Sequence, residues 1–403
     1  MKLLSKIQTE FTESVALREA ASEDAIDETA PQIVASPRDA EAAQKLVAWC
    51  GREDVAFIAR GGATKIGVGA KPSRCDLIIS TEHLNAIIEH DVGNATVAAG
   101  AGVALSKLNE VVMKSGQFVP LDDAFSGEAV LHAGATLGGA VAANDFGQSR
   151  LKYGAPRDLV VGLHAALSDG RYIKAGSKVV KNVSGYDLNK LFIGSFGTLG
   201  LITQVIIRLR PQDACNRRWS STPADWKQAC EAVETIMNGA FEPTYLRLMA
   251  ANGKFYLAAR FDGGEEAVNS QIERLDKSTS SETDEVTDGE LVLRARLPLQ
   301  SAARWAKSAS EKGAAEVLWD CGIGAVRAVF SKTPDDAAKL VDVLRREAQA
   351  DGGFLVVEKA PANLKTPDWV WGAPRDDFAL MRRLKDSFDK PNVCAPGRFV
   401  GGL

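Results

Sequence analysis

Residues 59–69 read ARGGATKIGVG and directly follow the apolar run VAFI of residues 55–58. A strand that ends in glycines brings unshielded backbone N–H groups close together, and such a concave set of donors binds phosphate oxygens well. The stretch has neither the GxxxxGK[ST] pattern of a nucleoside-triphosphate loop nor the GxGxxG pattern of a Rossmann fold. From these residues alone, a phosphate-binding loop and an ordinary glycine-rich turn explain the stretch equally well.

The length and composition describe a globular protein with more than one core. The chain has 403 residues, of which 45% are hydrophobic and 25% charged, so two domains, or one large domain with an inserted one, are expected. The net charge of -4 and the lack of a dense Lys/Arg run argue against binding to nucleic acid.

The sequence shows no targeting segment or metal cluster. The first 15 residues have no apolar core of signal-peptide length, and no stretch is long and apolar enough to span a membrane, so we expect a cytoplasmic protein. The six cysteines are scattered without a CxxC pair. We therefore expect mostly reduced, buried thiols, and no zinc or iron–sulfur cluster held by this chain alone. All four histidines precede residue 165.

Periodicity predicts alternating elements in the first half of the chain. We expect residues 1–30 to form one amphipathic helix that ends before Pro31, and we expect a helix at 37–50 between strands at 33–36 and 55–59. Further predicted elements are strands at 77–80, 86–90, 95–99 and 201–209, and a helix at 105–115. The apolar run 159–167, the Asp169-Gly170 pair and residues 171–173 predict a β-hairpin.

A second glycine-rich stretch, GATLGGAVAANDFG, covers residues 134–147. Tight helix packing explains Gly138 and Gly139 on one interpretation. On the other, the stretch supplies a second wall of backbone amides facing the first loop, because a dinucleotide diphosphate needs donors from more than one side.

Five motifs in register resemble the FAD-binding domain of the vanillyl-alcohol oxidase type. They are RGGAT at 60–64, ATLGGAVAAN at 135–144 with Gly147, RLKYGAPRD at 150–158, KNVSGYDLNKL at 181–191 and GSFGTLGLIT at 194–203. The resemblance covers roughly residues 30–210, and PNVCAPGR at 391–398 resembles the PxGIxNPGR tail of the same superfamily. It implies an α+β domain of two subdomains with FAD extended between them.

The resemblance also implies the cofactor-binding residues. Backbone N–H groups next to Arg60 would wrap the diphosphate, and the second stretch would close it from the other side. The implied residues are Gly61, Gly62, Ala63 and Thr64 on the first wall; Ala135, Thr136, Gly138 and Gly139 on the second; Asn144, Gly147 and Arg150 facing the flavin; Thr198, Gly200 and Ile202 at the adenine end; and Pro120 and Leu121 near the isoalloxazine. Arg398 is either a further cofactor contact or a surface arginine.

Three departures from the family pattern affect these expectations. Ala63 stands where a third glycine is common, which is tolerable if its φ is negative. Phe196 replaces the usual acidic residue of GSEGTLG, so an ionic role is lost there. The glycine loop contains no histidine or cysteine, so we expect noncovalent FAD.

The pattern changes after residue 211. We expect an N-terminal extension at 1–30, the FAD-binding domain at 31–211, a smaller α+β cap with an antiparallel sheet at 212–360, and a segment at 361–403 that returns to the FAD domain. The cap prediction rests on helices at 224–238 and 334–348, strands at 245–249, 254–259, 290–297 and 326–330, and a polar loop at 278–289. A last helix is predicted at 378–388.

The predicted cap contains no histidine. The relatives that oxidise 2-hydroxy acids use histidines to bind a divalent ion or to remove the hydroxyl proton, so that kind of metal-assisted site is hard to build here. The cationic residues Arg247, Lys254, Arg294 and Arg327 lie on predicted strands, where charged side chains usually form a solvated face. We predict no metal site and assign no catalytic residue.

The short cap, the missing histidines and the run WVWGAPRDDFALMRRLKDSFDKPNVCAPGRFVGG at 369–402 resemble the family of FAD-binding E subunits of bacterial glycolate oxidases. This resemblance implies a complex with a catalytic FAD subunit and an iron–sulfur subunit that oxidises glycolate to glyoxylate, at the inner membrane only through those partners. The alternatives are a free-standing FAD-dependent oxidase or dehydrogenase for another alcohol or hydroxy acid, and a scaffold protein without flavin.

Overall fold

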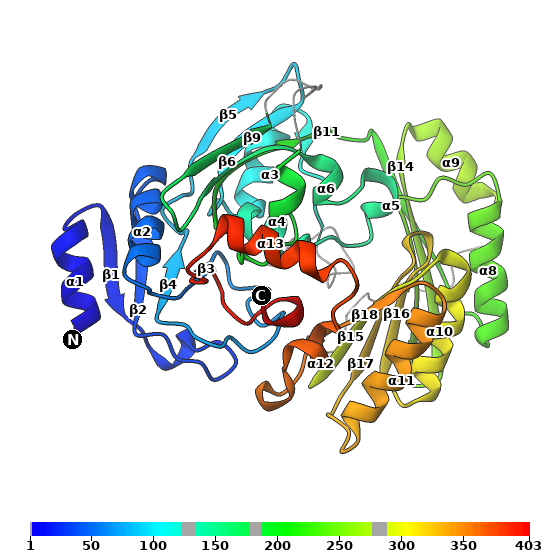
Figure 1. The fold of residues 1–403 in the computed structure, drawn as a ribbon. Coiled ribbons are helices and arrows are strands. Elements are labelled where there is room, and N and C mark those ends of the chain that lie inside the picture. Colours follow the sequence, from blue (N-terminus) through cyan, green and yellow to red (C-terminus); the bar gives the residue numbers. More distant parts are fainter. Residues whose placement is uncertain (1, 123–133, 177–186, 276–287) are drawn as a thin grey trace.

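The computed structural model describes residues 2–122, 134–176, 187–275 and 288–403. Two sheets with their helices form one part of the molecule, and a larger third sheet forms the other (Figure 1). This mixed arrangement confirms the predicted α+β fold class. Within the described residues, no helix is long and apolar enough to cross a membrane.

The first sheet presents the glycine loop. Its strand order is β1-β2-β4-β3, with β1 (Val15–Glu19) antiparallel to β2 (Ile33–Pro37), and with β2, β4 (Leu77–Ser80) and β3 (Phe57–Arg60) parallel. Helix α2 (Ala40–Arg52) connects β2 to β3, is capped by the Asp39 side chain and buries Leu46 and Val47. Because β3 ends at Arg60, the glycines begin at the carboxyl end of this strand.

The second sheet has the order β5-β6-β10-β8-β9. Its strands are β5 (Ile87–Asp91), β6 (Thr96–Gly100), β8 (Val160–Ala166), β9 (Tyr172–Gly176) and β10 (Leu201–Arg208). Strands β8 and β9 pair antiparallel across the Asp169-Gly170 turn, which confirms the predicted hairpin. The remaining elements of this part are α3 (Leu105–Met113), α4 (Leu137–Ala143), α5 (Arg150–Tyr153), α6 (Pro156–Leu159), α7 (Asn189–Phe192) and the pair β7 (Gln117–Phe118) and β11 (Arg210–Pro211).

The third sheet is antiparallel with the order β12-β14-β13-β16-β17-β15-β18. Its strands are β12 (Cys215–Ser221), β13 (Tyr245–Ala251), β14 (Lys254–Gly263), β15 (Leu291–Arg296), β16 (Glu316–Asp320), β17 (Ala325–Phe330) and β18 (Phe354–Lys359). Helices α8 (Trp226–Asn238), α9 (Glu265–Glu273), α10 (Leu299–Glu311) and α11 (Ala337–Ala350) cover its outer face (Figure 1). We call this part the cap; the predicted domain boundaries stay predictions.

The two faces of the cap sheet differ in polarity. Along β15, Leu291, Leu293 and Ala295 point into the apolar core, and Arg294 and Arg296 therefore point to the opposite face. That opposite face is turned toward the part of the molecule that contains the first two sheets (Figure 1). We call that part the flavin-type part, because the sequence resemblance predicts FAD there.

The C-terminal segment runs back to the first sheet. Helices α12 (Pro367–Trp371) and α13 (Phe378–Phe388) precede it. Phe57 then donates its N–H to Val393 O and accepts from Ala395 N, both at 2.8 Å. The segment therefore lies beside β3, next to the start of the glycine loop.

Some expectations from the sequence need correction. Residues 1–30 do not form one helix, because α1 (Lys2–Phe11) ends and β1 then pairs with β2. The prediction missed α9, α10, β12, β16 and β18. Most of the polar loop at 278–289, and residues 181–186 of the fourth motif, lie outside the described residues.

Candidate functional site

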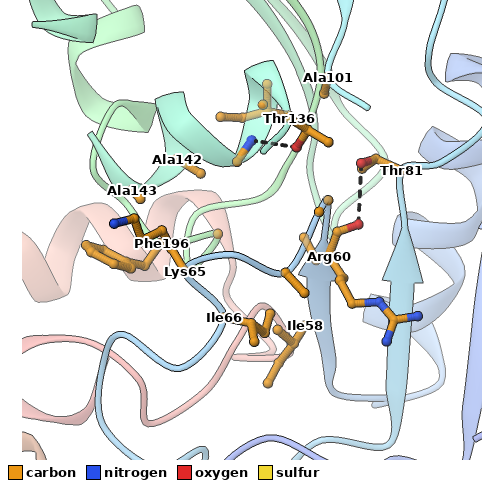
Figure 2. Close-up of a pocket in the computed structure, with 18 of the residues that line it drawn as sticks. Ile58, Arg60, Lys65, Ile66, Thr81, Ala101, Thr136, Ala142, Ala143 and Phe196 are labelled. Carbon is orange, nitrogen blue, oxygen red and sulfur yellow. Dashed lines mark hydrogen bonds between the residues drawn. The ribbon is translucent and has the colours of Figure 1, made fainter. Parts of the chain in front are cut away.

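A pocket lies between the glycine loop, α4 and the start of β10 (Figure 2). Its lining includes residues from all three segments that the sequence singled out. The predicted residues that line it are Arg60, Gly61, Gly62, Ala63, Thr64, Thr136, Gly138, Gly139, Gly200, Ile202 and Arg398.

The first wall of this pocket carries unused donors. The backbone N–H groups of Gly61, Gly62, Ala63 and Thr64 donate no hydrogen bond to any residue in the described ranges. Further along, Ile66 N donates to Ala63 O and Val68 N to Lys65 O, so the chain turns back on itself directly after the four donors. Four consecutive free donors form the kind of nest that binds a phosphate.

Glycine is required at this wall because the second glycine stretch comes very close. A Cβ atom added to Gly61 would lie 2.0 Å from Thr136 Oγ1, and one on Gly62 would lie 1.5 Å from Gly134 O. Both distances are far below van der Waals contact. Any side chain at these positions would push the two walls apart.

On the second wall, two of the four predicted residues use their amides inside the protein. Gly138 N donates to Ala101 O at 2.8 Å, and Gly139 N donates to Thr136 Oγ1 at 3.3 Å (Figure 2). A Cβ on Gly138 would lie 2.5 Å from the Ala101 Cβ, so close packing of α4 explains this glycine. The amides of Gly138 and Gly139 are thus engaged within the protein, whereas those of Ala135 and Thr136 donate to no residue in the described ranges.

Ala63 does not meet the condition set for it. Its φ is 60°, in the left-handed region, whereas alanine would be tolerated without strain only at a negative φ. The loop therefore adopts the backbone that a third glycine would favour, and alanine holds it under strain.

Two arginines shape the loop through their side chains. The Arg60 guanidinium donates to Asp24 Oδ1 at 2.5 Å, and Figure 2 shows the side chain directed away from Thr136. Arg398 is 3% exposed and donates to the carbonyl oxygens of Ile66 and Val68. Arg398 is therefore a buried residue that lines the pocket and holds the loop, and not a surface arginine.

A second pocket adjoins the first and reaches the cap. It shares Lys65, Ala143 and Phe196 with the first pocket, while Arg294, Arg296 and Glu358 line it from the cap. We call it the junction pocket.

Two charge pairs occupy the junction pocket. Lys65 Nζ lies 3.4 Å from Asp145, and Arg294 donates to Glu358 at 2.9 Å and to Phe146 O at 3.0 Å. Burial lowers the pKa of Lys65, while the charges of Asp145 and Glu358 oppose that shift. The pKa of Glu358 is lowered because the charges of Arg294, Lys65 and Arg327 outweigh its burial.

The expectation of a solvated charged face is wrong for most of the cap arginines. Arg247 is 2% exposed and pairs with Asp320 at 2.7 Å, and Arg327 is 8% exposed and lies 3.6 Å from Glu358. Only Lys254 of the four is exposed. The face is buried because it is covered by the other part of the molecule.

Comparison with known proteins agrees with this geometry. A family model described as an FAD binding domain matches residues 31–176. Glycolate oxidase subunit GlcD of Bacillus subtilis is 25% identical over 422 residues, which cover 91% of this chain and 88% of that protein. The chain contains an FAD binding domain and resembles proteins of the vanillyl-alcohol oxidase type. It is GlcD-like over most of its length and is an FAD-dependent oxidoreductase.

Two further comparisons define the extent of the likeness. A D-lactate dehydrogenase of Archaeoglobus fulgidus is 36% identical to this flavoprotein over 221 residues, which cover 52% of the chain and 46% of the relative. A solved structure of alkyldihydroxyacetonephosphate synthase has a TM-score of 0.68 at 16% identity, and the match covers 92% of this chain and 76% of that one. This last likeness concerns the fold.

The other predicted cofactor residues of the flavoprotein lie outside the first pocket. Pro120 and Leu121 line a third pocket, beside the buried Asp122. Asn144 lines the junction pocket. Of the remainder, Gly147 N donates to Asp122 at 3.0 Å, Arg150 stacks on Phe146, Thr198 hydrogen-bonds Ser195 O, and Ala135 accepts from Leu105 N.

The sequence pattern did not reveal Lys65 or the packing of Phe196. Lys65 directly follows the predicted donors in the sequence, and this position could have indicated that it lines the pocket. Phe196 has φ 53°, an uncommon backbone for a bulky residue, and its ring packs 5.1 Å from Trp371 and 5.8 Å from Phe399. Phe196, which stands where an acidic residue is usual, thus lines both pockets and packs against the C-terminal segment.

Proposed function

We propose that this flavoprotein holds FAD noncovalently, with the diphosphate on the N–H groups of Gly61, Gly62, Ala63 and Thr64. The observation that supports this site is the run of four free donors. The second glycine stretch lies so close to Gly61 and Gly62 that neither position has room for a side chain. Gly200 and Ile202 line the same pocket at the end expected for adenine, and Lys65 and Phe196 lead from it toward the cap.

We propose that the reaction is the oxidation of a small 2-hydroxy acid to the 2-oxo acid. The relatives named above include a glycolate oxidase subunit and a D-lactate dehydrogenase, and D-2-hydroxyglutarate dehydrogenases are similar over part of the chain. Bound FAD supplies the acceptor for the two electrons that leave the carbinol carbon. The protein supplies binding and orientation in the junction pocket.

The chain's own residues keep the site in shape. Arg398 fixes the carbonyl groups of Ile66 and Val68, so the loop after the donors cannot open. Lys365, which pairs with Asp27 at 2.6 Å, also donates to Gly67 O. These contacts preorganise the N–H donors before the cofactor binds, which reduces the ordering cost of binding.

We further propose that the flavoprotein works within a complex like that of a glycolate oxidase, with a catalytic FAD subunit and an iron–sulfur subunit. The sequence contains no CxxC pair, so iron–sulfur clusters for onward electron transfer would come from a partner. The resemblance of residues 369–402 to the FAD-binding E subunits also favours this arrangement.

Two matched variants test the FAD site. Gly62→Ala places a Cβ against Gly134 O, whereas a Cβ on Gly67 meets nothing within 4 Å. We expect Gly62→Ala to weaken FAD binding, measured by quenching of flavin fluorescence, by at least about tenfold. Gly67→Ala should bind FAD like the unmodified chain. Equal affinity in both variants would argue against the loop as the diphosphate site.

A steady-state assay tests the reaction and the need for partners. The isolated chain, loaded with FAD, is assayed against glycolate and D-lactate with an artificial electron acceptor, and native partners are identified by co-purification. We expect slow turnover alone and co-purification with a second flavoprotein and an iron–sulfur protein. Fast turnover alone would favour the free-standing enzyme, and failure to take up FAD would favour the scaffold.

A further inference from the structure

Three guanidinium groups surround one aromatic ring where the flavin-type part meets the cap. The guanidinium carbon of Arg296 lies 4.0 Å from the centre of the Phe146 ring, that of Arg150 lies 4.2 Å from it and that of Arg294 lies 5.2 Å from it. Arg150 and Phe146 belong to the flavin-type part, and the other two arginines lie on β15 of the cap. The ring gives each cation a modest stabilisation.

The carboxylates nearby are already engaged. Asp145 lies 3.4 Å from Lys65 and 3.7 Å from Arg294, and Glu358 pairs with Arg294 at 2.9 Å. The side chain of Arg296 forms no ion pair or hydrogen bond with a residue in the described ranges, and its Nη1 atom is buried without a hydrogen-bond partner. Among the described residues, no carboxylate therefore forms a direct ion pair with this guanidinium.

Such an arrangement is costly unless an anion binds. A buried guanidinium donor without an acceptor loses its hydration, and the like charges of Arg294 and Arg150 add repulsion. Burial lowers the pKa of Arg296 well below its ordinary value, and the neighbouring arginines lower it further. An acceptor with negative charge would relieve both penalties.

The position of Arg296 indicates which anion fits. Arg296 lines the junction pocket together with Lys65 and Phe196, which also line the pocket of the four free donors. A small anion held there would lie beside the proposed cofactor. The planar guanidinium fork matches a carboxylate, which it can bind through two parallel hydrogen bonds.

We propose that Arg296 binds the carboxylate of the substrate. Glu358 holds Arg294 in place, and Arg150 adds positive charge on the Phe146 ring. This inference rests on the proposed 2-hydroxy acid oxidation and assigns its substrate-binding residue. It also gives the cap a role that needs no histidine, because the anchor is a guanidinium.

Calorimetric titration of the full chain tests the proposal directly. The probes are glycolate, D-lactate and D-2-hydroxyglutarate, with glycolamide as the neutral analogue of glycolate, each titrated anaerobically with and without FAD. We expect at least one of the three acids to bind, and the corresponding amide to bind at least about tenfold more weakly. No binding of any acid, or equal binding of an acid and its amide, would overturn the proposal.

Variants then assign the anion to Arg296. Arg296→Met should weaken binding of the acid by about 10- to 100-fold, and Arg296→Lys should restore part of the affinity because it returns the charge without the fork. Arg304→Met is the matched control, since Arg304 is exposed on α10 and pairs with Asp351. Unchanged acid binding in a folded Arg296→Met protein would refute the assignment.

The outcomes separate this inference from the proposed function. If the unmodified chain takes up no FAD, the proposed oxidation fails, yet titration without FAD still reports on the anion site. If FAD binds and acids bind equally to Arg296→Met and the unmodified chain, only the assignment of Arg296 fails. The comparison of glycolate with glycolamide needs no variant, so it stands even where a substitution impairs folding.

Discussion

Ala63 shows how a single residue can be held against its own preference. Its left-handed φ of 60° costs an alanine about 1–2 kcal/mol relative to a right-handed conformation. The backbone of the loop has no room for another conformation here, because the carbonyl of Gly134 lies against Gly62. The strain is located in the loop that we propose to hold the diphosphate, as is common at functional sites.

We predict that Ala63→Gly stabilises the protein slightly. The substitution removes that strain of about 1–2 kcal/mol, of which about 0.4–1 kcal/mol is offset by the greater freedom of glycine in the unfolded chain. Thermal unfolding followed by circular dichroism should show an equal or higher Tm, with FAD affinity retained. Ala59→Gly at the end of β3 is the control and should lower Tm; a lower Tm for Ala63→Gly would contradict the strain.

Asp24 is the residue that orients Arg60. It is 2% exposed and accepts from Arg18 at 2.6 Å and from Arg60 at 2.5 Å. The hydrogen bond from Arg18, with further hydrogen bonds from the Ala21 backbone and Arg60, holds the pKa of Asp24 well below its ordinary value of 3.8. The carboxylate therefore stabilises the folded state above pH 3.8, and this stabilisation is lost as the pH falls below 3.8 toward the lowered pKa.

We predict that Asp24→Asn destabilises the protein by about 1–3 kcal/mol at neutral pH. The difference from the unmodified chain should be constant from pH 7 to about pH 5 and should shrink below pH 3.8, as measured by urea unfolding at several pH values. Asp54→Asn is the control, because Asp54 is an exposed partner of Arg74. A difference that stayed constant into acid would show that the charge of Asp24 does not matter.

At the level of elements, helix α13 is fastened to the flavin-type part by a buried ion pair. Lys385 Nζ donates to Asp389 Oδ2 at 2.6 Å, to Thr198 O at 2.8 Å and to Cys394 O at 2.9 Å. Asp389 also accepts from Ser168 Oγ at 2.7 Å. This network brings the C-terminal segment against the loop that precedes β10.

We predict that Lys385→Met destabilises the protein by about 3–5 kcal/mol, because it leaves the carboxylate of Asp389 buried without its cation. Urea unfolding monitored by tryptophan fluorescence measures the loss. Lys390→Met, at an exposed position of the same segment, should change stability little. Similar stability of both variants would mean that the buried pair is not what fastens the segment.

At the scale of the whole molecule, the cap has its own apolar core. The cluster that contains Trp219, Trp305 and Val357 consists of cap residues, while separate clusters fill the two sheets of the flavin-type part. Contacts between the parts include polar ones, such as those of Lys152 with Asp213 and with Asp262 O. Separate cores joined by an interface that includes polar contacts favour independent unfolding.

We predict two transitions in differential scanning calorimetry, of which FAD raises one. Ligand binding stabilises only the unit that holds the ligand, by an amount that grows with the free FAD concentration. The second transition, which we assign to the cap, should stay within about 1 °C of its position without FAD. A single transition that shifts as a whole would show that both parts unfold together.

Much of the fold could be predicted from local patterns. The helix at 37–50, the Asp-Gly hairpin and the final helix at 378–388 follow from apolar spacing and turn residues, which act over a few neighbouring positions. Strand β1 was missed because it is short and exists through its pairing with β2. Helices α9 and α10 were missed because their apolar positions are interrupted by polar ones.

The sequence by itself determined the resemblance to FAD-binding proteins, the α+β class and the two glycine stretches, because motifs and their spacing can be read from the order of residues along the chain. Only the tertiary structure decided which amides stay free: Gly138 N meets Ala101 O, whereas the amides from Gly61 to Thr64 meet no described carbonyl. It also decided that Arg294 reaches Phe146, 148 residues away. Hydrogen bonds and ion pairs depend on which groups come together when the sheets pack, and the local spacing of residues in the sequence does not specify this.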